Sequence, residues 1–134
     1  MQIVKIYLVS VVVFFAIDLV WLGVIAKNLY QKYLGYLMRN PVNWAAAIIF
    51  YLIFVAGMVF FVIHPALEKG SFSYAILVGA LFGFITYATY DLTNLATVRD
   101  WPLFITVVDL IWGTTLGALT SGIAFFVVHT FLSQ

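Results

Sequence analysis

Residues 72–98 read FSYAILVGALFGFITYATYDLTNLATV, an apolar run that carries a single acidic residue, Asp91. The run exceeds the roughly 20 residues that a helix needs to cross a bilayer. Three comparable runs occupy residues 3–26, 42–63 and 103–128. Helix is preferred over strand because hydrocarbon tolerates no unpaired backbone groups, and four segments cannot close a barrel. The sequence therefore predicts an all-α membrane protein, a four-transmembrane-helix bundle that forms one integral membrane domain over residues 1–134.

The composition of the whole chain points to the same solvent. Its 134 residues are 66% hydrophobic and 8% charged, with a mean hydropathy of +1.15. Ordinary soluble domains are about 45–50% apolar and about 25% charged, so a soluble fold of this size cannot hide such a surface. A net charge of +1 offers no basic patch for nucleic acid, and the lack of cysteine excludes thiolate chemistry. Membrane lipids are the partners that this composition implies.

The segment between the first two runs, residues 27–39, has a different character. One helical face would carry tyrosine and leucine, and the basic side chains would point away from it. We expect a short interfacial helix in the headgroup layer; the alternative is a polar loop with anchoring aromatics. The residues of the apolar face are Tyr30, Tyr33, Leu34 and Leu37.

The boundaries of the runs carry start and stop signals. Asn40 followed by Pro41 is a cap and first turn for the second helix, and His64 followed by Pro65 is expected to end it. Ser71 or Ser73 can cap the third helix. The tripeptide at residues 100–102 predicts that Asp100 caps the fourth helix and that Pro102 lies in its first turn.

The distribution of basic residues predicts the orientation. The side that holds the first and third loops carries four Lys or Arg residues, and the opposite side carries Lys5 and Lys69. By the positive-inside rule the four-charge side is cytoplasmic, which places both termini on the periplasmic or extracellular side. The four basic residues are Lys27, Lys32, Arg39 and Arg99.

Three aspartates lie inside the apolar runs at one common depth: Asp18, Asp91 and Asp109. Asp18 precedes Lys27 by nine positions, Asp91 precedes Arg99 by eight, and Asp109 follows Pro102 by seven. At about 1.5 Å per residue, each lies roughly 10–14 Å from the same end of its helix. A carboxylate in hydrocarbon costs about 2.5–3.5 kcal/mol, so three of them predict a polar site within the bilayer. Equal depth does not fix helix rotation, so sequence alone leaves open whether they share one pocket.

The chemistry of such a site depends on its charge state. Shared burial and mutual repulsion would favour the protonated form of at least one carboxyl group, which then exchanges a proton; ionised carboxylates would instead need a cation. The proton-exchange candidates are Asp91, Asp18 and Asp109, with Asp91 the first choice. Neighbouring side chains at helical spacing form an expected ligand wall, suited to an organic cation. Its members are Trp21, Tyr87, Tyr90, Asn94 and Trp112. We expect no cofactor and no metal, and the opposing reading is that the aspartates only bind helices together.

Small residues predict which helices pack most closely. Gly79 and Gly83 are four apart in the third run, and Gly113, Gly117 and Ser121 repeat at the same interval in the fourth. Such spacing lets helix backbones approach one another, so we expect the third and fourth helices to pack tightly.

The chain also resembles a known family. Residues 15–30 (FAIDLVWLGVIAKNLY), the run that begins at Tyr90 (YDLTNLA) and Asp100-Trp-Pro resemble a bacterial family of small membrane proteins, domain-of-unknown-function family 2177. The resemblance implies a multi-pass protein of the bacterial inner membrane, and it carries over no catalytic roles.

Three functions remain open from the residues alone. The first is binding and transport of a small amphipathic or cationic ligand with proton coupling, for which we expect a homodimer, since four short helices enclose little volume. The second is a membrane-embedded enzyme that modifies a lipid or isoprenoid-like substrate with aspartate acid and base. The third is a structural or accessory subunit.

Overall fold

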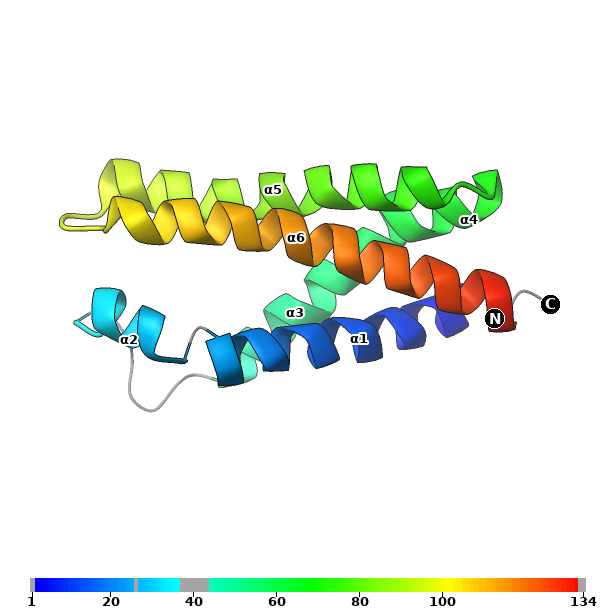
Figure 1. Cartoon of the computed structure of the whole chain (residues 1–134), viewed down its shortest axis with the longest axis horizontal. Helices are drawn as coiled ribbons and strands as arrows, with labels where there is room; N and C mark the ends of the chain where they lie inside the picture. Colours follow the sequence, from blue (N-terminus) through cyan, green and yellow to red (C-terminus); the bar gives the residue numbers. More distant parts are fainter. Residues whose placement is uncertain (1, 26, 37–43, 133–134) are drawn as a thin grey trace.

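The computed structural model describes residues 2–25, 27–36 and 44–132 (Figure 1). Within them, four stretches are long and apolar enough to cross a membrane: Ile3–Val24, Trp44–Lys69, Phe72–Thr97 and Leu103–Leu132. The described residues contain helices and turns but no strand. The predicted fold class, an all-α bundle of four membrane-spanning helices, is therefore confirmed.

The chain alternates long α-helices with short π-helical turns. The first span joins α1 to the π-helical η1, and the short α2 follows it. The second span joins α3, the π-helical η2 and α4; α5 and α6 form the last two spans, and the π-helical η3 ends the described chain. The bounds are α1 Gln2–Val20, η1 Trp21–Ile25, α2 Lys27–Leu34, α3 Trp44–Met58, η2 Val59–Ile63, α4 His64–Lys69, α5 Phe72–Thr97, α6 Leu103–Val127 and η3 Val128–Leu132.

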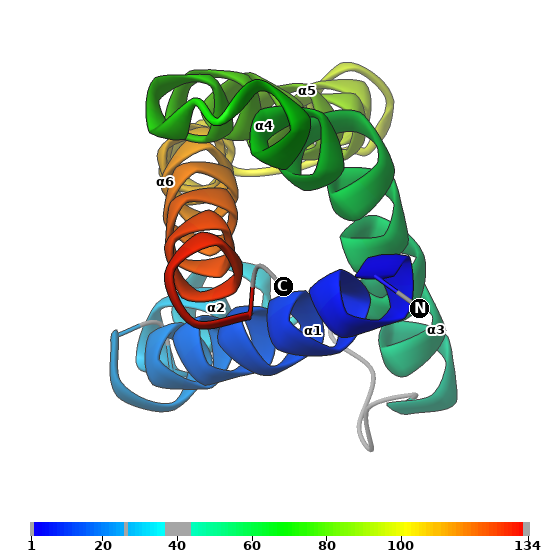
Figure 2. The ribbon, with the colours of Figure 1, turned by 90° about the vertical axis from the view of Figure 1, so that its right-hand side faces the viewer.

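The four spans surround a common centre (Figure 2). Helices α5 and α6 form an antiparallel hairpin, and α1 lies along α6. Helix α3 crosses obliquely, so that its first half lies against α1, while η2 and α4 at its far end contact α5. Both termini lie at one end of the bundle, and α2 lies at the other with the turn between α5 and α6 (Figure 1).

Glycine determines how closely α5 approaches α6. A Cβ added at Gly83 would overlap the carbonyl oxygen of Gly113, and one added at Gly117 would overlap the carbonyl oxygen of Gly79. At Gly79 an added Cβ would lie 2.5 Å from the Ser121 hydroxyl oxygen. The two backbones are thus in direct contact along this stripe, as the spacing of small residues predicted.

The second span does not end at His64 and Pro65, contrary to the prediction. The helix widens through η2, where the His64 backbone N–H donates to the Val59 carbonyl, and continues as α4 to Lys69. Pro65 occupies the first turn of α4, a position where its missing N–H removes no required hydrogen bond. Gly70 then ends the helix with a left-handed φ of 63°.

One of the two testable cap predictions is confirmed and the other is wrong. The Ser71 hydroxyl accepts a 3.0 Å hydrogen bond from the Tyr74 backbone N–H at the start of α5. Asp100 does not cap α6, because the helix begins after Pro102 with no side-chain cap. Asp100 instead has a left-handed φ of 62° in the turn, a conformation that aspartate tolerates. Asn40 and Pro41 lie outside the described residues.

The predicted short helix between the first two spans is present as α2. Leu34, on its predicted apolar face, is buried with Trp101 and Ile105, and Tyr33 packs beside them. The Tyr36 hydroxyl, just beyond α2, donates a hydrogen bond to the Asp100 carbonyl. Helix α2 is thereby attached to the turn between α5 and α6; its position in a headgroup layer stays a prediction.

Candidate functional site

The three aspartates of the predicted polar layer are all buried inside the bundle. The exposed fraction is 5% for Asp18, 0% for Asp91 and 6% for Asp109. They come from three different spans: Asp18 from α1, Asp91 from α5 and Asp109 from α6. Buried ionisable groups in a membrane-spanning bundle are costly, and they need partners within the protein or a ligand.

Asp91 and Asp109 form a pair across the seam between α5 and α6. Their carboxyl groups interact with one another through their side chains. Neither carboxyl oxygen of Asp91 has a hydrogen-bond donor among the described residues. Two ionised carboxylates can only accept, so they can hydrogen-bond to each other only when one of them carries a proton. The arrangement is that of a carboxyl pair with room for one shared proton.

Asp18 has a partner that the sequence reading missed. The hydroxyl of Tyr51 on α3 hydrogen-bonds to the Asp18 carboxyl group. None of the site residues predicted from the sequence lies in the second span. Tyr51 is the one hydroxyl-bearing side chain in residues 42–63. A single phenol in an otherwise apolar span was the signal that could have identified it.

Tyr87 links the three carboxyl groups to one another. It lies within electrostatic range of Asp18, Asp91 and Asp109, and of Tyr51 as well. Its ring fits over Gly113, where an added Cβ would come within 2.5 Å of the Tyr87 Cγ. Tyr87 thus follows Gly79 and Gly83 at the same interval of four on α5, and its ring lies against α6. The structure gathers the three aspartates around this tyrosine.

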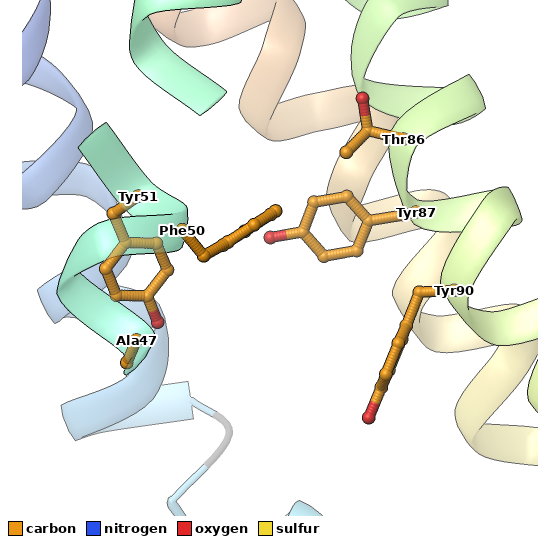
Figure 3. A pocket seen from close by; sticks show the side chains of 6 residues that line it. All are labelled: Ala47, Phe50, Tyr51, Thr86, Tyr87 and Tyr90. Atoms are coloured by element: carbon orange, nitrogen blue, oxygen red, sulfur yellow. The ribbon is translucent and has the colours of Figure 1, made fainter. Parts of the chain in front are cut away.

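A cleft of about 460 Å³ lies beside this cluster, between α3 and α5. Phe50 and Tyr87 point toward each other across it, and Tyr90 continues the α5 wall away from Thr86 (Figure 3). Phe50 and Tyr90 are 44% and 57% exposed, so the cleft has an open edge on the side of the bundle. Its lining residues are Ala47, Phe50, Tyr51, Thr86, Tyr87 and Tyr90.

The remaining members of the expected ligand wall lie in two places. Asn94 is half-buried one turn below Tyr90 and hydrogen-bonds with it. Trp21 and Trp112 stack on one another, with ring centroids 4.3 Å apart and planes inclined by 8°. This pair lines a separate, apolar groove between α1 and α6. Of the predicted ligand-binding residues, Tyr87 and Tyr90 line the cleft between α3 and α5, which we call the tyrosine cleft. Trp21 and Trp112 do not line it.

Trp101 connects the site to α2. Its indole Nε1 donates a 3.0 Å hydrogen bond to the Thr106 hydroxyl, which lies 3.5 Å from the Asp91 carbonyl oxygen. The Trp101 ring also meets the Tyr90 ring edge to face at 5.8 Å. Because Leu34 of α2 packs on Trp101, this residue contacts both α2 and the cleft, and it is connected to the Asp91 backbone through the Thr106 hydroxyl.

The cluster is not arranged as a metal centre. Among the described residues, no three acidic or histidine side chains are placed to hold one metal ion. His64 and His129 lie at the end of the bundle that holds the termini, where His64 approaches Glu68 at 3.8 Å and His129 stacks on Phe125. Buried carboxyl groups beside aromatic rings can exchange protons and bind cations.

These features define a multi-pass membrane protein with an acidic, tyrosine-lined site inside a four-helix bundle. Residues 3–126 match the family described as "Predicted membrane protein (DUF2177)", and the chain belongs to this family. The match confirms the resemblance found in the sequence. No curated protein matches the chain, and no solved structure matches it.

Proposed function

We propose that this protein binds a small amphipathic or cationic ligand in the tyrosine cleft and moves it across the membrane in exchange for protons. One observation supports this most directly: Tyr87 lines the cleft and also lies within electrostatic range of all three buried carboxyl groups. A ligand in the cleft therefore changes the electrostatic surroundings of every carboxyl group in the cluster.

The proton-exchanging group in this proposal is Asp91. It faces Asp109, and neither of its oxygens has a donor in the part of the chain that the structure describes, so the two carboxyl groups can hydrogen-bond only when they share a proton. A cation that enters the cleft stabilises the doubly ionised pair, and the proton leaves. Asp18, which hydrogen-bonds to Tyr51, and Asp109 are the partner carboxyl groups of Asp91. Occupancy and protonation thus exclude each other, which is the requirement for exchange.

The cleft is closed toward the end of the bundle that holds the termini. Phe14, Phe54 and Leu116 fill the interior as members of one buried cluster. Transport requires a second arrangement in which these side chains separate. We propose that two copies of the chain form the transport unit, since four helices enclose little volume. Chemical cross-linking in native membranes tests this, and a purely monomeric product contradicts it.

The experiment uses proteoliposomes with an imposed pH gradient. The ligand is first identified by mass spectrometry of small molecules and lipids that co-purify with the wild-type protein. The Asp18→Asn, Asp91→Asn and Asp109→Asn variants, each verified as folded, are expected to lose that species and its gradient-driven uptake. Uptake that persists in all three variants refutes proton coupling. Variants that lose only stability or assembly, with no ligand-dependent effect, favour the structural role.

A second candidate function is a membrane-embedded enzyme acting on a lipid or isoprenoid-like substrate. It is favoured by the position of the facing Asp91–Asp109 pair beside an open-edged aromatic cleft, because one carboxyl can act as acid and its neighbour as base. Turnover of such a substrate by detergent-solubilised protein, without any gradient, supports the enzyme. Gradient-dependent movement of an unaltered ligand supports the transporter.

A further inference from the structure

The wall of the tyrosine cleft is largely aromatic. Phe50 and Tyr51 come from α3, and Tyr87 and Tyr90 from α5 (Figure 3). The negative face of an aromatic ring attracts an ammonium group within about 6 Å, most strongly where water is excluded. Four rings line the cleft, and an ammonium head that lies against a ring face gains this attraction, whereas an anion does not.

The carboxyl groups next to the cleft also favour a positively charged ligand. Three carboxyl groups surround Tyr87, and Asp91 has neither oxygen satisfied by a donor among the described residues. The sequence has no Lys or Arg at this depth: none falls within residues 6–26, 40–68, 70–98 or 100–134. A buried carboxylate requires a counter-charge, and at this depth a ligand can supply it.

The open edge of the cleft faces sideways. Phe50 and Tyr90 line it from two membrane-spanning helices, and both side chains are about half exposed. The side of a spanning helix contacts lipid chains. The volume of about 460 Å³ lies in the range of small-molecule sites, about 300–1,000 Å³. A cleft of this size has room for a headgroup and the start of a chain, and its open edge leaves a path into lipid for the rest of the chain.

We propose that the ligand is an alkylammonium amphiphile, a positively charged amine or quaternary ammonium head on a long apolar chain, which enters from the lipid between α3 and α5. The head lies against the rings of Tyr87 and Tyr90 with the carboxyl cluster behind it. The chain leaves past Phe50. This inference rests on the proposed function and names the ligand class of its site.

The test measures binding by equilibrium dialysis against protein in uncharged maltoside micelles, with empty micelles subtracted. Three probes separate the contributions: hexadecyltrimethylammonium has head and chain, tetramethylammonium has the head alone, and hexadecyl sulfate has the chain with an anionic head. Saturable binding of the first is expected, at least tenfold tighter than that of either other probe. Equal binding of hexadecyl sulfate overturns the proposed charge selection, and equal binding of tetramethylammonium overturns entry from lipid.

Two pairs of variants locate the binding to the cleft. Ala47→Phe fills the cleft, and Ala45→Phe places the same side chain on the exposed surface of the same helix. Hexadecyltrimethylammonium binding should fall about tenfold or more in Ala47→Phe and stay unchanged in Ala45→Phe. Tyr90→Leu removes a ring and should weaken binding about tenfold, whereas Tyr90→Phe keeps the ring and weakens it far less. Tyr90 is largely exposed, so this pair still tests the inference if Ala47→Phe does not fold. Binding that ignores both changes overturns it.

The outcome is distinguishable from that of the proposed function. If proton-driven transport depends on Asp91 while no cationic probe binds in the cleft, the ligand class is wrong and proton-coupled transport stands. If the probe binds in the cleft but Asp91→Asn leaves binding and proton release unchanged, the ligand class stands and proton coupling fails. Proton release is read from the pH of a weakly buffered protein solution as the probe is added.

Discussion

The two sides of α5 differ sharply in how they meet their neighbours. Toward α6, Gly79 and Gly83 let the two backbones touch, and the seam has no room for a methyl group. Toward α3, the large side chains of Phe50 and Tyr87 face each other across a cleft. Close contact on one side brings Asp91 and Asp109 together, and the wide spacing on the other leaves the cleft in which we propose that a ligand binds. A tight seam and an open cleft on one helix are thus parts of one site.

The largest expected effect comes from adding one methyl group to the seam. Gly83→Ala places its Cβ on the Gly113 backbone, which cannot move aside without separating α5 from α6. The clash is expected to lower the free energy of unfolding by about 3 kcal/mol, against a gain of up to about 1 kcal/mol in helix propensity. Thermal denaturation followed by circular dichroism in one detergent measures it. An unchanged melting temperature would show that the seam is looser than the structure indicates.

Removal of the Tyr51 hydroxyl tests the link from α3 to the carboxyl cluster. Tyr51→Phe keeps the ring but leaves the buried Asp18 without its donor. The expected cost is about 1–3 kcal/mol of stability, the penalty for an unsatisfied buried polar group. The double variant Tyr51→Phe/Asp18→Leu removes both partners and should recover most of that loss. Additive losses in this double-mutant cycle would contradict the hydrogen bond.

Asp91→Asn should change stability in the opposite direction. The amide can donate to Asp109 without a shared proton, so the unfolding free energy is expected to rise by about 1 kcal/mol while ligand-linked proton release disappears. Melting curves and the pH of weakly buffered protein report the two effects separately. A loss of stability with no effect on proton release would favour a purely structural role for the aspartate.

The smallest effect is expected on the α3 side of α5. Gly57→Ala introduces the same methyl group as Gly83→Ala, but its Cβ would lie 3.2 Å from the ring tip of Phe82. A ring can shift by a few tenths of an ångström where a backbone cannot, so stability should change by less than about 0.5 kcal/mol. Measured beside Gly83→Ala, this variant gives the difference between the two faces directly. A cost as large as that of Gly83→Ala would remove the contrast.

Some of the fold could be predicted because lipid makes the sequence signal strong. A run such as residues 72–98 is stable only as a buried or lipid-facing helix, and Gly79 and Gly83 at an interval of four indicate a close seam. The helix ends were harder to predict. Pro65 normally stops a helix, yet η2 changes the hydrogen-bond pattern just before it and the span continues. Aspartate is a common helix-capping residue, but Asp100 lies in the turn with a left-handed backbone and does not cap α6.

The candidate site, like the fold, could be predicted from the sequence only in part. The sequence by itself predicted that three aspartates lie at one depth in three of the four apolar spans, because the rise of a helix converts residue number into depth. Only the tertiary structure decided which way each helix face turns. It gathered the carboxyl groups around Tyr87, brought Tyr51 from an uncharged span to Asp18, and placed Trp21 and Trp112 on another groove. The physical reason is that the rotation and tilt of each helix depend on side-chain packing against helices that are distant in the chain. The hydropathy of a single span does not determine that packing.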